Sequence, residues 1–119
     1  MTPKLHASNE YKVNGRVWID SGKGPFLGFG RVELLKKLKE YGSISKSAKS
    51  MNMAYRQAWH LIESMNEKAV KPLVITFTGG KGGGGAEVTE EGERMICEFE
   101  MLNRAFMEFM EIKSGKLCI

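Results

Sequence analysis

The sequence has few of the residues that build disulfide frameworks or metal sites. It contains two cysteines and two histidines among 119 residues, and their positions show no metal-ligand spacing. Two cysteines form no disulfide framework, and we interpret Cys97 as a buried apolar residue. No stretch approaches the roughly 18–20 apolar residues that span a bilayer, and no secretory leader is evident. We therefore expect a cytoplasmic protein with no metal site and no membrane contact.

Catalytic patterns are missing as well. No paired acid and base and no activated nucleophile is visible. The glycine-rich run Gly79–Gly85 invites comparison with a phosphate-binding P-loop, but Ala86 and Glu87 follow it where a P-loop has lysine and then serine or threonine. We expect no catalytic residue and no cofactor, and hence no enzyme.

Charge is distributed unevenly along the chain. The net charge is +4, and residues 31–81 hold ten basic and four acidic side chains. Residues 82–112 hold two basic and eight acidic ones. The first segment suits a polyanion such as double-stranded DNA, whereas the second would be repelled by its phosphates.

The first half of the chain has the pattern of a strand followed by a helix. Apolar residues alternate at every second position within Tyr11–Asp20, which predicts an N-terminal strand. Glycines and a proline in Ser21–Pro25 predict a turn. A helix is expected from Phe29 or Gly30 to Tyr41, with Gly42 ending it as a C-terminal cap.

Two short helices are then predicted in close succession. Ser45 is a suitable N-cap for a helix that runs through Ala48 to Met51. Asn52 tolerates the left-handed conformation of a tight turn, and a second helix is expected over residues 54–66. Two short helices joined by three or four residues form a helix-turn-helix.

A β-hairpin is predicted directly after these helices. Its strands are Leu73–Thr78 and Ala86–Thr89, joined by a glycine-rich tip in which Lys81 is the only other residue. A hairpin that follows a recognition helix is the wing of a winged helix. The pattern therefore predicts an α+β fold: a winged helix-turn-helix with an N-terminal strand and a Gly-rich wing.

A long C-terminal helix is expected over about residues 89–112, with Thr89 as its N-cap. Apolar residues recur at spacings of four and three, as along a coiled-coil seam, and predict a homodimer interface: Met95, Phe99, Leu102, Phe106 and Phe109. We expect one domain over residues 11–112, with flexible tails at 1–10 and 113–119.

The stretch Gly15–Gly92 resembles the N-terminal DNA-binding domain of the ModE-type molybdate-responsive transcriptional regulators. Short runs carry the resemblance, and the glycine-rich one is the most specific: Gly24–Gly28 with Gly30 and Arg31; Gly42–Ser45; Tyr55, Arg56, Ala58 and Trp59; and Thr78–Ala86. The resemblance implies a winged-helix domain that dimerises and binds a palindromic operator. Such regulators often have serine before the Tyr-Arg pair, where this chain has Ala54.

Molybdate binding is not expected for this chain. ModE-type regulators usually carry C-terminal molybdate-binding modules, whereas this sequence ends after one long helix. We therefore predict that the chain alone has no tight molybdate site.

The candidate DNA contacts lie on the two short helices and the hairpin. Arginine can bond guanine at two points, and glutamine can do the same for adenine, so Arg56 and Gln57 are the expected base readers. Trp59 is interpreted as a core residue, and His60 faces either solvent or the groove. The full candidate set is Ser45, Lys46, Ser47, Tyr55, Arg56, Gln57, His60, Thr78 and Lys81.

Two functional readings remain at this stage. The favoured one is a sequence-specific DNA-binding transcriptional regulator that acts as a dimer. The alternative is a protein-interaction adaptor that uses the Met/Phe-rich C-terminal helix, with an incidental basic face. The charge split favours the first, because an adaptor has no need of it.

Overall fold

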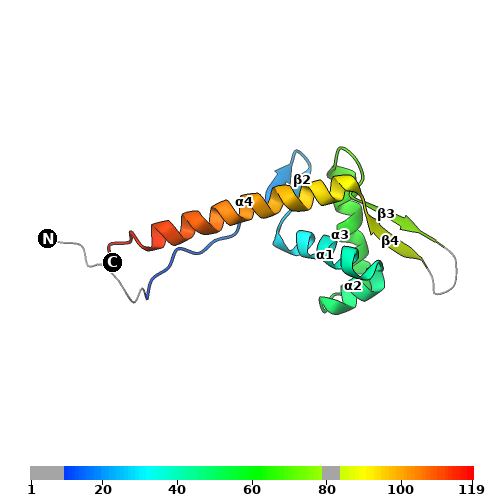
Figure 1. Cartoon of the computed structure of the whole chain (residues 1–119), viewed down its shortest axis with the longest axis horizontal. Helices are drawn as coiled ribbons and strands as arrows, with labels where there is room; N and C mark the ends of the chain where they lie inside the picture. The colour runs from blue at the N-terminus through cyan, green and yellow to red at the C-terminus, as the bar shows by residue number, and fades with distance from the viewer. Residues whose placement is uncertain (1–9, 79–83) are drawn as a thin grey trace. The chain divides into compact units, whose positions relative to one another are not determined.

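The computed structural model describes residues 10–78 and 84–119. Within them lie four helices and two small antiparallel sheets (Figure 1). This mixed architecture is compatible with a winged helix. In chain order the elements are β1 (Ile19–Ser21), β2 (Gly24–Leu27), α1 (Phe29–Tyr41), α2 (Ile44–Ser50), α3 (Tyr55–Lys68), β3 (Val74–Phe77), β4 (Gly85–Val88) and α4 (Glu90–Ser114).

The chain divides into two compact units. One comprises Met1–Val17 together with Glu100–Ile119, and the other comprises Trp18–Phe99. Helix α4 contributes residues to both units and extends to Ser114, two residues into the expected C-terminal tail. The single domain predicted over residues 11–112 stays a prediction. No helix among the described residues has the length and apolar character needed to cross a membrane.

The predicted N-terminal strand over Tyr11–Asp20 is wrong for most of its length. Residues 11–18 have no strand structure, and β1 begins only at Ile19. Alternation of apolar residues does not provide a neighbouring strand, and among the described residues only the part next to the turn pairs with one. There β1 pairs with β2, and the Ser21 hydroxyl donates to the Gly24 carbonyl across the turn at 3.0 Å. Gly24 adopts φ +115°, a conformation that favours glycine.

Helices α1 and α2 follow the predicted pattern, with one correction at a helix start. The apolar stripe of α1 is buried, and Gly42 ends the helix in the left-handed conformation with φ 65°. The N-cap of α2 is Ser43 and not Ser45: the Ser43 hydroxyl accepts a hydrogen bond from the Lys46 amide at 3.2 Å. Asn52 has φ 52°, as predicted for the turn before α3.

Helix α3 is fixed to the β3–β4 hairpin by one side chain. The apolar face of α3 is fully buried at Ala58 and Met65. Near the end of the helix, the Asn66 side-chain oxygen accepts from the amides of Leu73 and Val74 at 2.8 and 3.2 Å. The Asn66 amide nitrogen donates to the Val74 carbonyl at 2.9 Å. Three hydrogen bonds thus hold the first residues of the hairpin against the last turns of α3.

The β3–β4 hairpin also contacts α1, and Figure 1 shows the hairpin beside α1, α2 and α3. Strand β3 pairs in antiparallel register with β4, from Val74 opposite Val88 to Phe77 opposite Gly85. The Ala86 amide donates to the carbonyl of Gly42, the cap of α1, at 3.0 Å. The hairpin predicted from the sequence is confirmed in its strands, while residues 79–83 of its tip lie outside the described residues.

Helix α4 begins as predicted. The Thr89 hydroxyl accepts from the Gly92 amide at 3.0 Å and donates to the Pro72 carbonyl at 2.7 Å. A Cβ at Gly92 would overlap the Leu73 carbonyl oxygen, so glycine is required where α4 passes β3. Cys97 is exposed, and its interpretation as a buried residue is therefore wrong.

The other unit pairs an extended segment with the second half of α4. The Val13 amide donates to the Ser114 hydroxyl at 2.8 Å. Gly15 lies against Phe106 and Met110: a Cβ at Gly15 would come within 3.2 Å of the Phe106 ring. Met110 is 8% exposed, so this unit has a small apolar core of its own.

Candidate nucleic-acid interface

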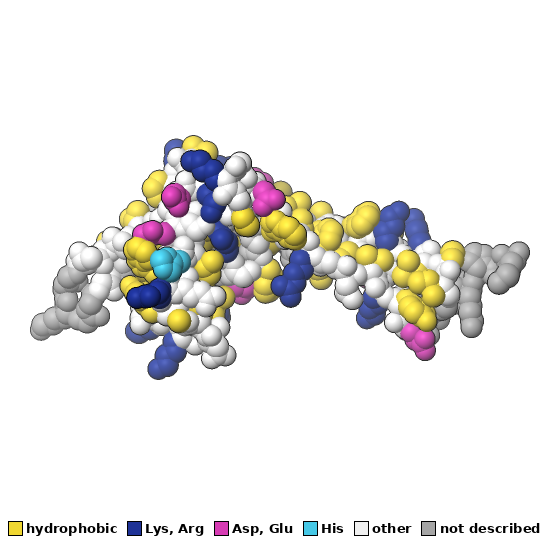
Figure 2. Space-filling model, turned by 180° about the vertical axis from the view of Figure 1, so that it is seen from behind, with side chains coloured by type: hydrophobic (Ala, Val, Ile, Leu, Met, Phe, Trp, Pro, Cys, Tyr) yellow, Lys and Arg dark blue, Asp and Glu magenta, His cyan; other side chains and the backbone are white. Residues whose placement is uncertain are grey.

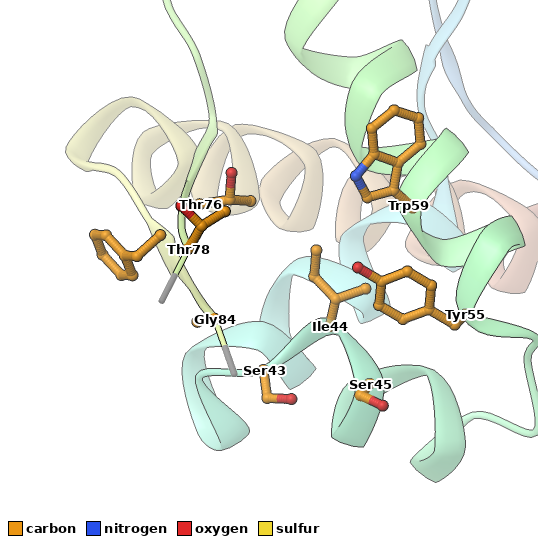
Figure 3. A pocket seen from close by; sticks show the side chains of 10 residues that line it. Ser43, Ile44, Ser45, Tyr55, Trp59, Thr76, Thr78 and Gly84 are labelled. Atoms are coloured by element: carbon orange, nitrogen blue, oxygen red, sulfur yellow. The ribbon is translucent and has the colours of Figure 1, made fainter. Parts of the chain in front are cut away.

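A groove of about 360 Å³ lies between α2, the start of α3 and the β3–β4 hairpin. Ser43, Ile44 and Ser45 line it from α2 and its cap, Tyr55 and Trp59 from α3, and Thr76, Phe77, Thr78, Gly84 and Gly85 from the hairpin. Figure 3 shows Thr76 and Thr78 across the groove from Tyr55 and Trp59, with Ile44 between the two pairs. The three elements predicted for DNA recognition therefore meet at one surface.

The groove has an apolar floor with hydroxyl-bearing side chains around it. Ser45, Tyr55, Thr76 and Thr78 all bring a hydroxyl to its wall. A hydroxyl can donate to a phosphate oxygen or accept from a base amino group, and an indole N–H can donate only. Hydroxyl and amide groups supply many phosphate and sugar contacts in protein–DNA complexes. The groove can therefore hold a nucleic-acid backbone without a strong charge of its own.

The predicted base readers project beside this groove from the first turn of α3. Tyr55, Arg56 and Gln57 are all exposed. Arg56 does not line the groove, and Gln57 lines a second cavity of about 300 Å³ together with Arg31 and Trp18. The first turn of α3 therefore carries three exposed polar side chains.

Trp59 and His60 differ from the other candidates because their rings contact each other. The two rings meet edge to face, with centroids 5.5 Å apart. His60 is exposed, which leaves it able to reach either solvent or a groove. Trp59 is 38% exposed and lines the groove, so its interpretation as a core residue is wrong.

The remaining candidate contacts differ in their exposure. The Ser47 side chain is completely buried, and its hydroxyl has no hydrogen-bond partner among the described residues. Ser47 is therefore not available to DNA, and its prediction as a contact is corrected. Lys46 and Thr78 are exposed, whereas Lys81 lies outside the described residues.

Several groove residues were missed in the sequence: Ser43, Ile44, Thr76 and Phe77. The helical spacing of four between Tyr55 and Trp59 was a signal that both face one side. Likewise, Thr76 and Thr78 are two residues apart on a strand and so share a face. Neither signal shows which element lies opposite, so the groove itself was not predictable.

The predicted seam of α4 is partly buried and partly exposed. Phe99 is 2% exposed and belongs to the core of its own unit. Leu102 and Phe109 are 39% and 53% exposed, and Met95 and Phe106 are half-buried. Met107 and Ile112 add further exposed apolar surface. Figure 2 shows hydrophobic side chains on the surface along this helix.

The described residues offer no group of three or more His, Cys, Asp or Glu side chains that could hold a metal ion.

Comparison with known proteins confirms the resemblance to the ModE-type regulators. "Molybdenum transport protein ModE" of Azotobacter vinelandii is 32% identical over 102 residues, which are 86% of this chain and 38% of that protein. "DNA-binding transcriptional dual regulator ModE" of Escherichia coli K12 is 39% identical over 84 residues, 71% of this chain and 32% of that protein. "Transcriptional regulator ModE" of Yersinia pestis is 46% identical over 72 residues, 60% of this chain and 27% of that protein.

The extent of these matches is limited on the relatives' side. The chain spans between about a quarter and two-fifths of the length of the relatives it matches. No family model matches the chain. The relatives from Escherichia coli and Yersinia pestis are named as transcriptional regulators and not as enzymes, in agreement with the prediction that this chain is not an enzyme.

Proposed function

We propose that this chain is a cytoplasmic, sequence-specific DNA-binding transcriptional regulator that binds a palindromic operator as a dimer. One observation carries the proposal: the exposed first turn of α3 lies beside a groove that α2 and the β3–β4 hairpin complete. Similarity to proteins named as ModE transcriptional regulators supports the same function.

In this proposal the first turn of α3 enters the major groove of the duplex. Arg56 and Gln57 read base edges there by paired hydrogen bonds. Tyr55, Ser45, Thr78 and the hairpin tip with Lys81 hold the phosphate backbone. The basic residues between positions 31 and 81 provide the affinity that does not depend on sequence.

The dimer is proposed to form through the second half of α4. Leu102 and Phe109 are exposed there, and each apolar side chain of this size contributes roughly 1.5–3 kcal/mol when fully buried. Two copies of such a surface bury each other's apolar residues. A two-fold dimer places two recognition helices about one DNA turn apart, which matches a palindromic operator.

Selection of bound duplexes from a random DNA pool tests the proposal. A palindromic consensus, and binding that weakens steeply as salt concentration rises, are the expected results. Binding to all sequences with equal affinity would contradict sequence-specific regulation. Absence of salt-dependent binding to any duplex would favour the adaptor reading instead.

A further inference from the structure

Two cations converge on a single hydroxyl at the end of α3 that lies away from the groove. Arg31 Nη1 donates to Ser64 Oγ at 3.0 Å, and Lys68 Nζ donates to the same oxygen at 2.6 Å. Ser64 and Lys68 are one helical turn apart on α3, whereas Arg31 comes from the first turn of α1. The three side chains are half-buried.

Within the described part of the chain, this positive charge has no neutralising partner. Neither cation forms an ion pair with a carboxylate of residues 10–78 or 84–119. Two like charges that share one neutral acceptor repel each other, and partial burial strengthens that repulsion. Burial also lowers the pKa of the Arg31 guanidinium, which reflects the cost of holding this charge in place. An anion at this point would relieve both effects.

The same groups have hydrogen-bond donors to spare. Arg31 uses only Nη1 in its contacts with the described residues, where it donates to the Pro25 and Phe26 carbonyls as well as to Ser64. The Nε and Nη2 hydrogens are thus left for another acceptor. Lys68 has three donors and uses one, and its side chain passes Gly24, where a Cβ would come within 3.8 Å of Lys68 Cε.

We propose that Arg31, Ser64 and Lys68 form a binding site for a tetrahedral oxyanion of the phosphate class. The guanidinium offers its unused N–H donors, and the ammonium adds a point charge with two further donors. The Ser64 hydroxyl, which accepts from both cations, turns its own hydrogen toward the anion. The anion is either a free oxyanion or a phosphodiester of bound DNA.

Arg31 shares a cavity with Gln57, whereas Lys68 lies far along α3 from the proposed base reader Arg56. Arg56 and Lys68 are twelve residues apart on α3, which corresponds to about 18 Å along a helix at 1.5 Å per residue. The existence of the site does not depend on DNA binding. Since the site is half-exposed, it is a millimolar site for a free anion and not a tight one.

Titration of the full chain with inorganic phosphate, followed by amide and side-chain NMR shifts, tests the proposal. We expect saturable shifts at Arg31, Ser64 and Lys68. Lys68→Gln should weaken this binding about fivefold or more, and Lys68→Arg should largely restore it, because charge and donors return. Lys71→Gln, which removes the same charge three residues further along the chain and beyond the end of α3, is the matched control and should leave binding unchanged. Shifts that saturate equally in Lys68→Gln, or that fall elsewhere, would overturn the site.

A second arm identifies the source of the anion. The salt dependence of binding to a selected duplex is compared between Lys68→Gln and Lys71→Gln. The measured quantity is the slope of log affinity against log salt concentration. If this slope becomes shallower by about one in Lys68→Gln and not in Lys71→Gln, the anion is a DNA phosphodiester. An unchanged slope, together with lost phosphate binding, assigns it to a free oxyanion. The phosphate arm contains no DNA, so failure of the proposed DNA-binding function is distinguishable from failure of this site.

Discussion

Replacement of Asn66 tests how α3 and the β3–β4 hairpin are held together. In Asn66→Ala the amides of Leu73 and Val74 lose an acceptor, and the Val74 carbonyl loses a donor. Water cannot easily take over these roles, because the Leu73 and Val74 residues are 0% and 2% exposed. The structure thus predicts a loss of stability well above that of an ordinary surface substitution.

The expected size follows from the three bonds. Each hydrogen bond contributes roughly 0.5–1.5 kcal/mol net, and a buried group left unpaired costs about 1–3 kcal/mol. We therefore expect Asn66→Ala to lower the free energy of unfolding by about 2–4 kcal/mol. With a urea dependence of about 2 kcal/mol per molar, the middle of the usual range for a small protein, the unfolding midpoint should fall by about 1–2 M.

Urea denaturation followed by circular dichroism measures this change. Gln57→Ala is the matched control: Gln57 is an exposed amide on the same helix, and its replacement should change stability by no more than about 0.5 kcal/mol. If Asn66→Ala were as stable as Gln57→Ala, the Asn66 side chain would not be what fixes β3 to α3, and the reasoning would be refuted.

Three further predictions concern a helix cap, the dimer and the ligand. Ala54 is the N-cap of α3 and offers no side-chain hydrogen bond. Ala54→Ser should therefore stabilise the protein by about 0.5–2 kcal/mol in the same urea assay. No gain in stability would show that this helix end needs no side-chain cap. Phe109→Glu should dissociate the proposed dimer in sedimentation velocity, because Phe109 is 53% exposed on the proposed interface. Arg104→Glu, on the opposite face of α4, should leave the dimer intact. A Phe109→Glu variant that stays dimeric, or a parent protein that is monomeric, would refute the α4 interface. Calorimetry with molybdate should show no saturable heat at micromolar concentrations, because the cationic cluster at Arg31 and Lys68 is only half-buried; a stoichiometric heat would contradict this.

The helices were predictable because their signals are local. The apolar stripe of α1, the glycine cap at Gly42 and the left-handed Asn52 each depend on neighbours a few residues apart. The capping of α4 by Thr89 is of the same kind. Short-range chemistry of this sort can be read without knowledge of the tertiary structure.

The errors arose where a distant partner decides the outcome. Residues 11–18 of the predicted strand pair with no neighbouring strand in the described part of the chain, and alternation alone does not provide one. Ser43 and Ser45 are equally good caps by type, and the burial of Ile44 inside the helix decides between them. Ser47 is three residues after Ile44, on the buried face of α2, so its role as a contact could have been excluded by helical spacing.

Several residues of the candidate interface were predicted from the sequence, but the groove beside them was not. Tyr55, Arg56 and Gln57 were identified from their place at the start of the second helix, and all are exposed as required. The groove depends on the approach of Thr76 and Thr78 to α2, which long-range packing determines. The sequence therefore indicated the helix that we propose reads DNA, while the structure adds the groove that we propose receives the DNA backbone.

The specificity ratio of Arg56→Ala tests the central claim most directly. This ratio is the affinity for a selected operator divided by the affinity for a scrambled duplex, both measured at one fixed salt concentration. It is determined for the parent protein, for Arg56→Ala and for Lys23→Ala, which removes a basic residue on the β1–β2 turn and serves as the control. The proposed reading predicts that Arg56→Ala loses roughly 1–3 kcal/mol of this preference and that Lys23→Ala loses none. If the operator preference of Arg56→Ala equalled that of the parent, α3 would not be the element that reads the sequence.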